Sequence, residues 1–392
     1  MIYLDHAAAT PLTSRTLEVM TPYFRERFFN PSAPYLPAKR VREAYEAAKT
    51  DLARIIGAKG VDMIMTSGAT ESIQLAFTAA RGKVLVAATE HAAVLEAARS
   101  RKHDLIAVDA NGVIDLDDLH QKISDEVELI SISLANNELG TIQPLSEVAE
   151  LIREIREDRR ARGVKSPLFL HSDASQAMSL IDINVSRLGV DLLTINAAKV
   201  GGPKGVGALY VGRGIELKPL QRGGGQERGL RGGTENVPGV IGFTVAAQEV
   251  KSHLNSNRKK YQEMASILKR ELAHTLIISQ MGEKVKILGD SRRQLANFVP
   301  ICFTGVDAER LIYKLEQQEI YLSTGAACAA NKGTKSHVLA AIGLGDEEIM
   351  GSLRISLGST NTAEQMPIVA GALARAVAEE LHRTHKIKEA HE

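Results

Sequence analysis

Short apolar runs alternate with amphipathic helical stretches over the first two thirds of the chain. Between the runs lie charged segments such as 145–163, in which apolar residues recur at helical spacing. Strands without polar alternation, separated by helices, indicate an α/β domain with a mainly parallel sheet. Functional residues are then expected in loops after the carboxyl ends of the strands. The predicted strands are 84–88, 105–108, 128–134, 168–171, 191–195 and 207–211.

The pattern changes near residue 251, where a long polar helix is predicted. Strand-like runs follow at 284–288 and 297–306, then LRISLG at 353–358 and a last helix from about 363. This arrangement predicts a second, smaller α+β domain. We therefore expect a large domain at 12–250 and a small domain formed by 1–11 and 251–392, which carries a loop at about 323–335.

Composition excludes several classes of protein. The chain has 392 residues, 44% of them hydrophobic, and a formal net charge of +1, so no overall field attracts nucleic acid or an anionic membrane. No window reaches eighteen uncharged apolar residues, and Asp5 interrupts the short apolar run at the N-terminus. We expect a soluble cytoplasmic protein without a signal peptide, a membrane span or a direct nucleic-acid partner.

The two cysteines lie in contrasting surroundings. Two cysteines in a chain of this length exclude a disulfide framework and a four-ligand zinc site, and they favour a reducing compartment. Cys302 lies in the apolar run NFVPICFTGV and is predicted to be a buried packing residue with an inert thiol. Cys328 lies in STGAACAANKG, residues 323–333, among small and polar residues. That thiol is either idle in a flexible loop or one that must move.

Asp173 and Lys199 each follow a predicted strand, so both are expected to reach one crevice. Asp173 lies in HSDASQ after the strand 168–171, and Lys199 lies in NAAKVGG after the strand 191–195. An enzyme that uses pyridoxal 5′-phosphate needs this pair: a lysine for the Schiff base and a carboxylate that keeps the pyridine nitrogen protonated. The alternative is a helix-capping Asp and a surface Lys.

Two further stretches are candidates for contact with the same cofactor. In MTSGATESIQLAF, residues 65–77, small residues lead into a helix whose first N–H groups, with the hydroxyl of Thr70, can seat a phosphate. An ordinary helix start is the alternative. His91 follows the strand 84–88 and could stack on an aromatic ring or simply cap a helix.

Two loops offer groups that bind anions. Asn137 lies in LANNELGTIQP and could bind a cofactor oxygen or a substrate carboxylate, or form a turn. The segment GGGQERGLRGGTEN, residues 223–236 and called the glycine-rich loop below, carries Arg228, Arg231 and Thr234. It is either an anion-handling loop or a plain flexible connection. No βαβ turn frames it, so it is not a dinucleotide-binding fingerprint.

Taken together, these segments resemble the NifS-like cysteine desulfurases, enzymes of the aminotransferase class V group that use pyridoxal phosphate. The similarity runs over nearly the whole chain, through IYLDHAAATP, NPS, SGATES, TEHAAVL, NNELGTIQP, HSDASQ, KVGGPKGVGALYV, GGGQERGLRGGTENV, STGAACAA, SHVLAAIGL and LRISLG. It implies the fold-type I aminotransferase architecture, with a mainly parallel seven-stranded sheet in the large domain. It also implies a homodimer in which each active site borrows residues from the partner.

The resemblance assigns a role to each candidate. Lys199 matches the Schiff-base lysine, and Cys328 matches the nucleophile on a long mobile loop. The Cys328 thiol must be deprotonated before it attacks, either through His91 as a third catalytic residue or by the substrate itself. The cofactor-binding matches are Asp173 at the pyridine nitrogen, Gln176 at the phenolic oxygen, His91 stacked on the ring, Ala69, Thr70 and Asn196 near the phosphate, and Thr234 from the other subunit. Asn137 and Arg354 match the residues that hold the substrate carboxylate, and no metal is implied.

The chain departs from the family pattern at two places. Asn196, Ala197 and Ala198 precede the lysine where the family has a hydroxyl residue and a histidine, and APYLPAK after NPS lacks the family's His and Gly pattern. The resemblance implies conversion of L-cysteine to L-alanine, with sulfur left on Cys328 as a persulfide. An acceptor protein such as an iron–sulfur scaffold or a tRNA-thiolation enzyme would then receive it. The alternatives are a selenocysteine lyase or another carbon–sulfur lyase, and a scaffold without catalytic activity.

Overall fold

The large domain is built around one seven-stranded sheet. The computed structural model describes residues 1–275, 280–324 and 335–389, with 384–389 as backbone only. The strand order is β2-β8-β7-β6-β5-β3-β4, in which the run from β7 to β4 is parallel while β8 and β2 are antiparallel to their neighbours. The predicted mainly parallel sheet is confirmed. Its strands are β2 (Met63–Thr66), β3 (Lys83–Ala87), β4 (His103–Ile106), β5 (Val127–Ser131), β6 (Phe169–Asp173), β7 (Leu192–Asn196) and β8 (Gly207–Val211).

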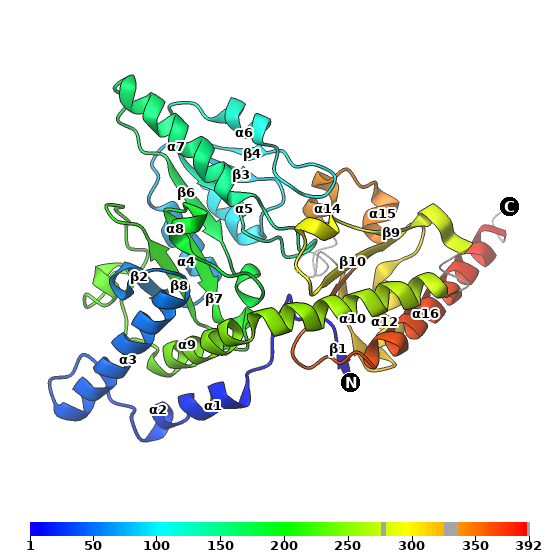
Figure 1. Ribbon diagram of the computed structural model, residues 1–392, viewed down its shortest axis with the longest axis horizontal. Coiled ribbons are helices and arrows are strands. Elements are labelled where there is room, and N and C mark those ends of the chain that lie inside the picture. Colours follow the sequence, from blue (N-terminus) through cyan, green and yellow to red (C-terminus); the bar gives the residue numbers. More distant parts are fainter. Residues whose placement is uncertain (276–279, 325–334, 390–392) are drawn as a thin grey trace.

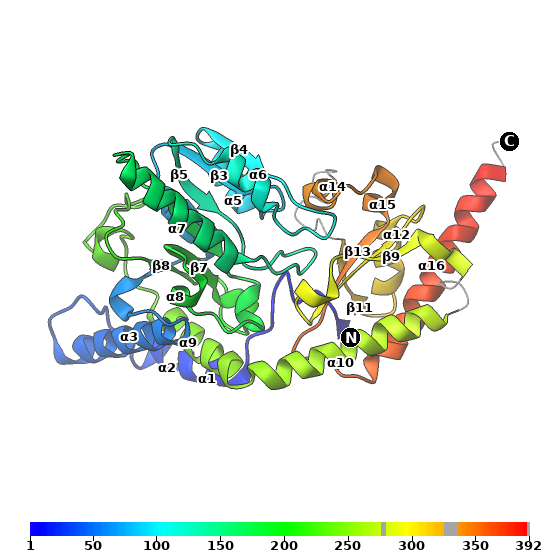
Figure 2. The same ribbon diagram turned by 45° about the horizontal axis from the view of Figure 1, so that its top comes forward.

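Helices cover both faces of this sheet (Figures 1 and 2). Alternate strand residues belong to two different apolar clusters, because successive side chains of a strand point to opposite faces. One face packs against α4 (Ala69–Phe77) and α5 (Ala92–Arg99), and the other against α3 (Leu36–Ile55), α7 (Leu145–Ala161) and α9 (Val237–Ser252). The remaining helices of this domain are α1 (Ser14–Met20), α2 (Pro22–Arg25), α6 (Leu116–Lys122) and α8 (Val185–Leu188).

The helix predicted at 145–163 shows why the apolar pattern is informative. Leu145, Val148 and Ile152 are buried in α7 and fall on one face of it, while the charged residues between them face water. The strands follow the same logic, since nearly every residue of β3, β5 and β7 is buried. The apolar faces of these helices and strands are therefore the ones that the fold buries.

The small domain contains a four-stranded antiparallel sheet in the order β12-β13-β10-β9. Its strands are β9 (Val285–Ile287), β10 (Phe298–Phe303), β12 (Ser323–Thr324) and β13 (Ser352–Ser356). The long α10 (Leu254–His274) leads into it and packs against the C-terminal α16 (Gln365–Glu389), as Figure 1 shows. The shorter helices are α12 (Ala308–Glu316), α14 (His337–Ala341) and α15 (Asp346–Met350).

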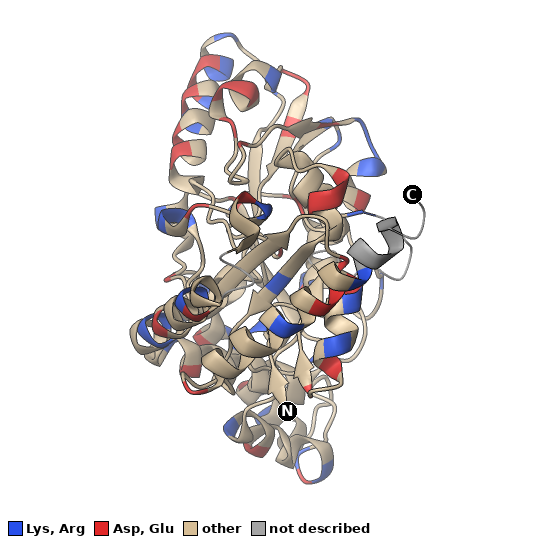
Figure 3. Cartoon of the chain, turned by 90° about the vertical axis from the view of Figure 1, so that its right-hand side faces the viewer, with Lys and Arg blue, Asp and Glu red and all other residues tan. Residues whose placement is uncertain are grey.

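The first residues of the chain lie with the small domain. The strand β1 (Ile2–Tyr3) pairs in parallel with β11 (Ile320–Tyr321), and Asp5 forms a bridge to Ser356 of β13. The domain bounds 12–250, 1–11 and 251–392 themselves stay a prediction. Within the described residues no helix is long and apolar enough to cross a membrane. On the face shown in Figure 3, acidic and basic residues are interspersed, in keeping with the net charge of +1.

The sheet differs from the sequence prediction in one unpredicted strand and in several strand bounds, since β5 ends at Ser131 rather than at 134 and β6 extends to Asp173 rather than to 171. The strand β2 was not predicted, because its sequence MIMT is rich in Met rather than in β-branched residues and a helix begins soon afterwards. It is an edge strand held by antiparallel pairing with β8. The strand β4 spans His103–Ile106, two residues earlier than the predicted 105–108.

Candidate active site

The carboxyl ends of the parallel strands bring several of the predicted residues to one edge of the sheet. Asp173 is the last residue of β6, and Lys199 ends a short 3-10 turn directly after β7. His91 caps α5 beyond β3, and Asn137 lies in the turn that follows β5. This convergence agrees with the rule that sites form at the carboxyl ends of strands in open α/β sheets.

Lys199 is held by the N-terminal segment of the chain. Its Nζ donates to the carbonyl oxygens of Ala7, at 2.8 Å, and Ala8, at 2.5 Å. Gln176 Nε2 donates to the same Ala7 oxygen at 2.8 Å. The amine and the amide predicted to meet one cofactor therefore converge on one carbonyl. The segment is itself anchored, because Thr10 bonds the carbonyl oxygen of Ala198 at 3.0 Å.

His91 and Asp173 share an electrostatic environment with Lys199. The Nδ1 atom of His91 accepts the N–H of Ala93 at 3.1 Å, which fixes the ring at the start of α5. Burial lowers the pKa of His91, the Asp173 carboxylate opposes this shift, and the positive charge of Lys199 adds to it. The imidazole is thus held neutral beside a buried carboxylate. The Oδ1 atom of Asp173 accepts the N–H of Ser175 at 2.9 Å.

The start of α4 has the features of a phosphate seat. Its N-cap residue, Gly68, has φ of +150° and provides no side-chain cap, and a Cβ added there would meet nothing within 4 Å. The first N–H groups of a helix have no partner within the helix, and the helix dipole favours an anion there. Ala69 and Thr70 form this first turn, and Thr70 is exposed. Asn196, at the end of β7, which β8 separates from β2, accepts the N–H of Ala198 at 3.2 Å.

Arg354 enters the site from the small domain, on β13. Its guanidinium is buried; NH2 donates to Asp5 Oδ1 at 2.6 Å and NH1 donates to the carbonyl oxygen of Asn137 at 2.9 Å. The buried Nε has no hydrogen-bond partner within the described structure. A buried, incompletely satisfied guanidinium is suited to bind a carboxylate.

Asp5 and Glu90 were missed as site residues by the sequence analysis. Asp5 was noted only as a charge in an apolar run, although that isolated charge was the available signal. Glu90 is fully buried; its carboxylate accepts the N–H of Ser133 at 2.6 Å, and its carbonyl oxygen accepts a hydrogen bond from His337 at 2.8 Å. Burial raises the pKa of Glu90 to about 8. Its position beside His91 in TEHAA gave no hint of that burial.

Two of the predicted roles, those of Thr234 and Cys328, are not tested by these contacts. Thr234 is exposed near the end of the glycine-rich loop, and its expected role is toward a partner subunit. Cys328 lies outside the described residues. The other cysteine, Cys302, is fully buried on β10, as predicted, and burial raises the pKa of its thiol.

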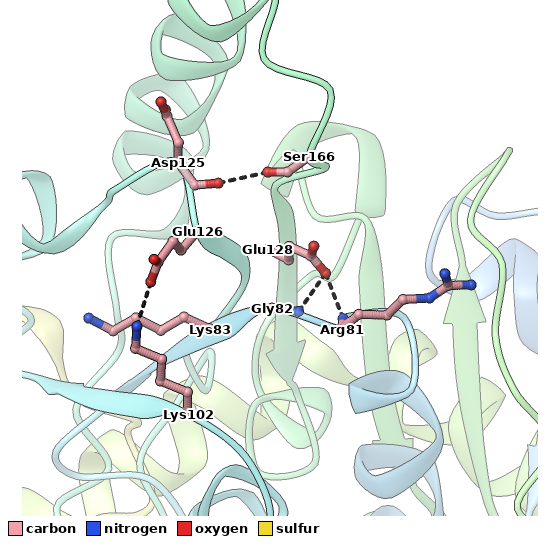
Figure 4. A pocket seen from close by; sticks show the side chains of 8 residues that line it. All are labelled: Arg81, Gly82, Lys83, Lys102, Asp125, Glu126, Glu128 and Ser166. Carbon is pink, nitrogen blue, oxygen red and sulfur yellow. Dashed lines mark hydrogen bonds and ion pairs between the residues drawn. The ribbon is translucent and has the colours of Figure 1, made fainter.

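A separate cavity of about 350 Å³ opens at the opposite, amino edge of the same sheet (Figure 4). Charged groups of its lining have partners in and around the cavity: Lys102 bonds Glu126, Lys83 pairs with Asp104, and Glu128 accepts the N–H groups of Arg81 and Gly82. These partnered groups do not form a convergent set for a ligand. The lining residues are Arg81, Gly82, Lys83, Lys102, Asp125, Glu126, Glu128 and Ser166.

Comparison with known proteins gives one consistent result. A family model for aminotransferase class-V matches residues 2–369. Cysteine desulfurase IscS 1 of Archaeoglobus fulgidus is 38% identical over 379 residues, which cover 93% of this chain and 94% of the relative. A solved NifS-like protein superposes with a TM-score of 0.86 at 30% identity, covering 96% of this chain and 99% of the other. The solved structure of SspA in complex with cysteine has a TM-score of 0.75 at 31% identity, with 91% and 99% covered.

Proposed function

The chain belongs to the aminotransferase class-V family, and on that premise we propose that it is a cysteine desulfurase that uses pyridoxal 5′-phosphate. One observation carries the proposal: Lys199, Asp173 and His91 converge at the carboxyl edge of the sheet, next to the buried Arg354. The relative from Archaeoglobus fulgidus is named a cysteine desulfurase, and one similar structure holds cysteine. The overall change is L-cysteine to L-alanine, with one sulfur atom passed to the enzyme.

The residues present fit the cofactor. When bound, pyridoxal phosphate supplies an electron sink for the charge left on the substrate when Cα loses its proton. Lys199 would hold its aldehyde carbon, Asp173 its pyridine nitrogen and Gln176 its phenolic oxygen. The uncapped start of α4, at Ala69 and Thr70, would bind the phosphate.

The phosphate seat and ring have further contacts in this proposal. Asn196 would lie near the phosphate, and Thr234 of a second subunit would complete the seat. His91 would lie against the ring as a neutral imidazole, because burial lowers its pKa. A neutral ring suits that position, since a charged imidazolium would repel the protonated pyridine nitrogen that Asp173 is expected to hold.

The substrate would be bound through its carboxylate, and it would react with the amine of Lys199 and the thiol of Cys328. Arg354 would bind the carboxylate, with Asn137 beside it. Lys199 Nζ would take the proton from Cα and return a proton to the product. The thiolate of Cys328 would then attack the substrate sulfur: the Cβ–S bond breaks, an S–S bond forms on the enzyme, and Cβ gains a proton. Atoms and electrons balance without an external oxidant.

A homodimer is part of the proposal. Several large apolar side chains between α1 and the start of α3 are exposed, and such a patch is typical of a surface covered in an assembly. They are Leu17, Phe24, Phe28, Tyr35 and Leu36. A second copy would also bring Thr234 to the neighbouring site. We place the enzyme in the cytoplasm, where thiols stay reduced and an iron–sulfur scaffold or a tRNA-thiolation enzyme could accept the sulfur.

The test is a stoichiometric assay on the purified protein. Incubation with L-cysteine and a thiol reductant should give alanine and sulfide in equal amounts, together with a yellow cofactor absorbance. Parallel reactions with selenocysteine and cystine distinguish a selenocysteine lyase or another carbon–sulfur lyase, which would favour those substrates. A colourless protein that yields neither product would point to a non-catalytic scaffold instead.

A further inference from the structure

The glycine-rich loop contains backbone strain that the proposed function does not explain. Glu227 and Arg228 have positive φ, +46° and +60°, although neither is glycine. Non-glycine residues in this region cost free energy and persist only where their surroundings hold them. The loop is also closed on itself, because the N–H of Gly232 donates to the carbonyl oxygen of Gln221 at 3.0 Å. Something outside the loop must hold this shape.

Residues of α3 and β2 hold the loop through the buried carboxylate of Glu227. It accepts hydrogen bonds from the hydroxyl of Tyr45, from Lys49 Nζ at 2.7 Å and from the N–H of Met65 at 2.9 Å. The side chains of Glu227 and Lys49 are 4% and 8% exposed, so this ion pair is shielded from water. Burial, with Glu227 adding to it, raises the pKa of Tyr45, and the phenol therefore stays a donor.

A second carboxylate of the loop meets the same face of α3. Arg42 forms an ion pair with the buried Glu235 at 3.1 Å. Arg42, Tyr45 and Lys49 are spaced three and four residues apart, which places them in one stripe along the helix. This stripe thus holds two carboxylates of the loop, those of Glu227 and Glu235. Thr234 directly precedes Glu235, so the stripe also fixes the position of Thr234.

The loop is also tied to the turn that begins α4. Glu227 bonds the N–H of Met65 on β2, directly before that turn. Arg231 Nε lies 3.2 Å from Glu71 Oε1, and the other oxygen of Glu71 accepts the N–H of Ser67 at 2.6 Å. The shape of the loop and the position of the first turn of α4 are therefore mechanically connected.

We propose that Glu227 and Glu235 are positioning residues for the binding of the cofactor phosphate. By fixing the glycine-rich loop on α3, they set both the start of α4 in their own subunit and the place from which Thr234 serves the other. This inference rests on the proposed function, since it assumes that Ala69, Thr70 and Thr234 contact a phosphate. A purely structural role would instead lower stability without changing the recognition of phosphate.

The test compares two aldehydes that differ only in the phosphate. Full-length protein freed of cofactor is titrated with pyridoxal 5′-phosphate and, separately, with pyridoxal, and each dissociation constant is measured by absorbance. Glu227→Gln should weaken pyridoxal phosphate roughly tenfold or more, the loss expected for a hydrogen bond to a charged group. It should leave the affinity for pyridoxal within about twofold, because Lys199 and Asp173 are untouched.

Two further variants make the comparison decisive. Glu235→Gln removes a partner of the more exposed Arg42 and should give a smaller loss of the same selectivity, even where Glu227→Gln folds poorly. Glu43→Gln changes an exposed carboxylate of the same helix and should bind both aldehydes as the wild type does. Equal weakening for both aldehydes, or unchanged selectivity in both loop variants, would overturn the inference. Failure of the wild type to bind either aldehyde would instead contradict the proposed function.

Discussion

At the amino edge of the seven-stranded sheet, Lys102 pairs with Glu126 and Lys83 with Asp104, and three of these four side chains are substantially exposed. At the carboxyl edge, charged groups of the same kinds are buried or half-buried and meet across long sequence distances, as Asp5 and Arg354 do. Exposed pairs are screened by water and contribute little free energy. Buried groups keep their fields and shift the pKa values of their neighbours. The difference locates the chemistry, because both edges hold charged residues but only one concentrates them out of water.

The largest expected effect is that of Lys199→Ala. Removing the amine should lower alanine formation from L-cysteine by more than roughly a thousandfold, since it both holds the cofactor and moves the proton. Lys102→Ala at the amino edge is the matched control and should keep the wild-type rate. Full turnover by Lys199→Ala would contradict the assignment of the chemistry to the carboxyl edge of the sheet.

Asp173→Asn should have the next largest effect. An amide cannot favour the protonated pyridine nitrogen, so kcat should fall roughly a hundredfold while the far-ultraviolet circular dichroism spectrum is retained. Asp125→Asn, which changes an exposed carboxylate paired with Arg162, supplies the control. Near-normal kcat in Asp173→Asn would show that this carboxylate has another role.

Asp5→Asn tests the long-range pair. Losing the charged partner of Arg354 should raise the KM for L-cysteine about tenfold, with a smaller change in kcat, because the guanidinium is no longer held toward the substrate carboxylate. Asp104→Asn breaks an ion pair at the amino edge and should leave KM unchanged. A KM unaffected by Asp5→Asn would mean that β13 alone fixes the arginine.

The smallest expected effect concerns stability and pH. Glu90 has a folded pKa of about 8 against an ordinary value of 4.5, so the unfolded chain gives up this proton first as the pH rises. Its contribution to stability is fully present below about pH 4.5 and is lost as the pH rises through 8. We therefore compare the free energy of unfolding of Glu90→Gln with that of the wild type at the two pH values. Between pH 5 and pH 9, this difference should change by about 1–3 kcal/mol in favour of Glu90→Gln.

The control for that measurement is Glu126→Gln at the amino edge. Its carboxylate is exposed, and its bond to Lys102 is screened by water, so the pH dependence of the melting temperature should match that of the wild type. Parallel profiles for Glu90→Gln and the wild type between pH 5 and 9 would show that Glu90 is not a buried acid in solution.

The sequence predicted the sheet and the positions of Asp173 and Lys199 because both are local properties. Buried strands and amphipathic helices follow from the apolar pattern, and a residue after a strand must lie at its carboxyl end. The strand β2 was not predicted, because its Met-rich sequence has little strand preference of its own. The strand depends on pairing with β8.

The missing site residues depend on long-range geometry. Asp5 meets a partner 349 positions away, and Glu90 is buried by packing that no local pattern encodes. The strain at Glu227 and Arg228 likewise depends on α3, which lies far away in sequence. Thr234 and Arg354 were candidates from the sequence itself, and the resemblance to known enzymes assigned them their expected roles.

The central claim is that sulfur leaves L-cysteine onto Cys328, and it can be tested by mass spectrometry of the protein itself. The enzyme is mixed with L-cysteine in the absence of reductant, its persulfides are trapped by alkylation, and its peptides are analysed. The account predicts one added sulfur atom on the peptide that contains Cys328 and none on the peptide with the buried Cys302. Alanine formation with no sulfur on Cys328, or with the sulfur on Cys302, would contradict it.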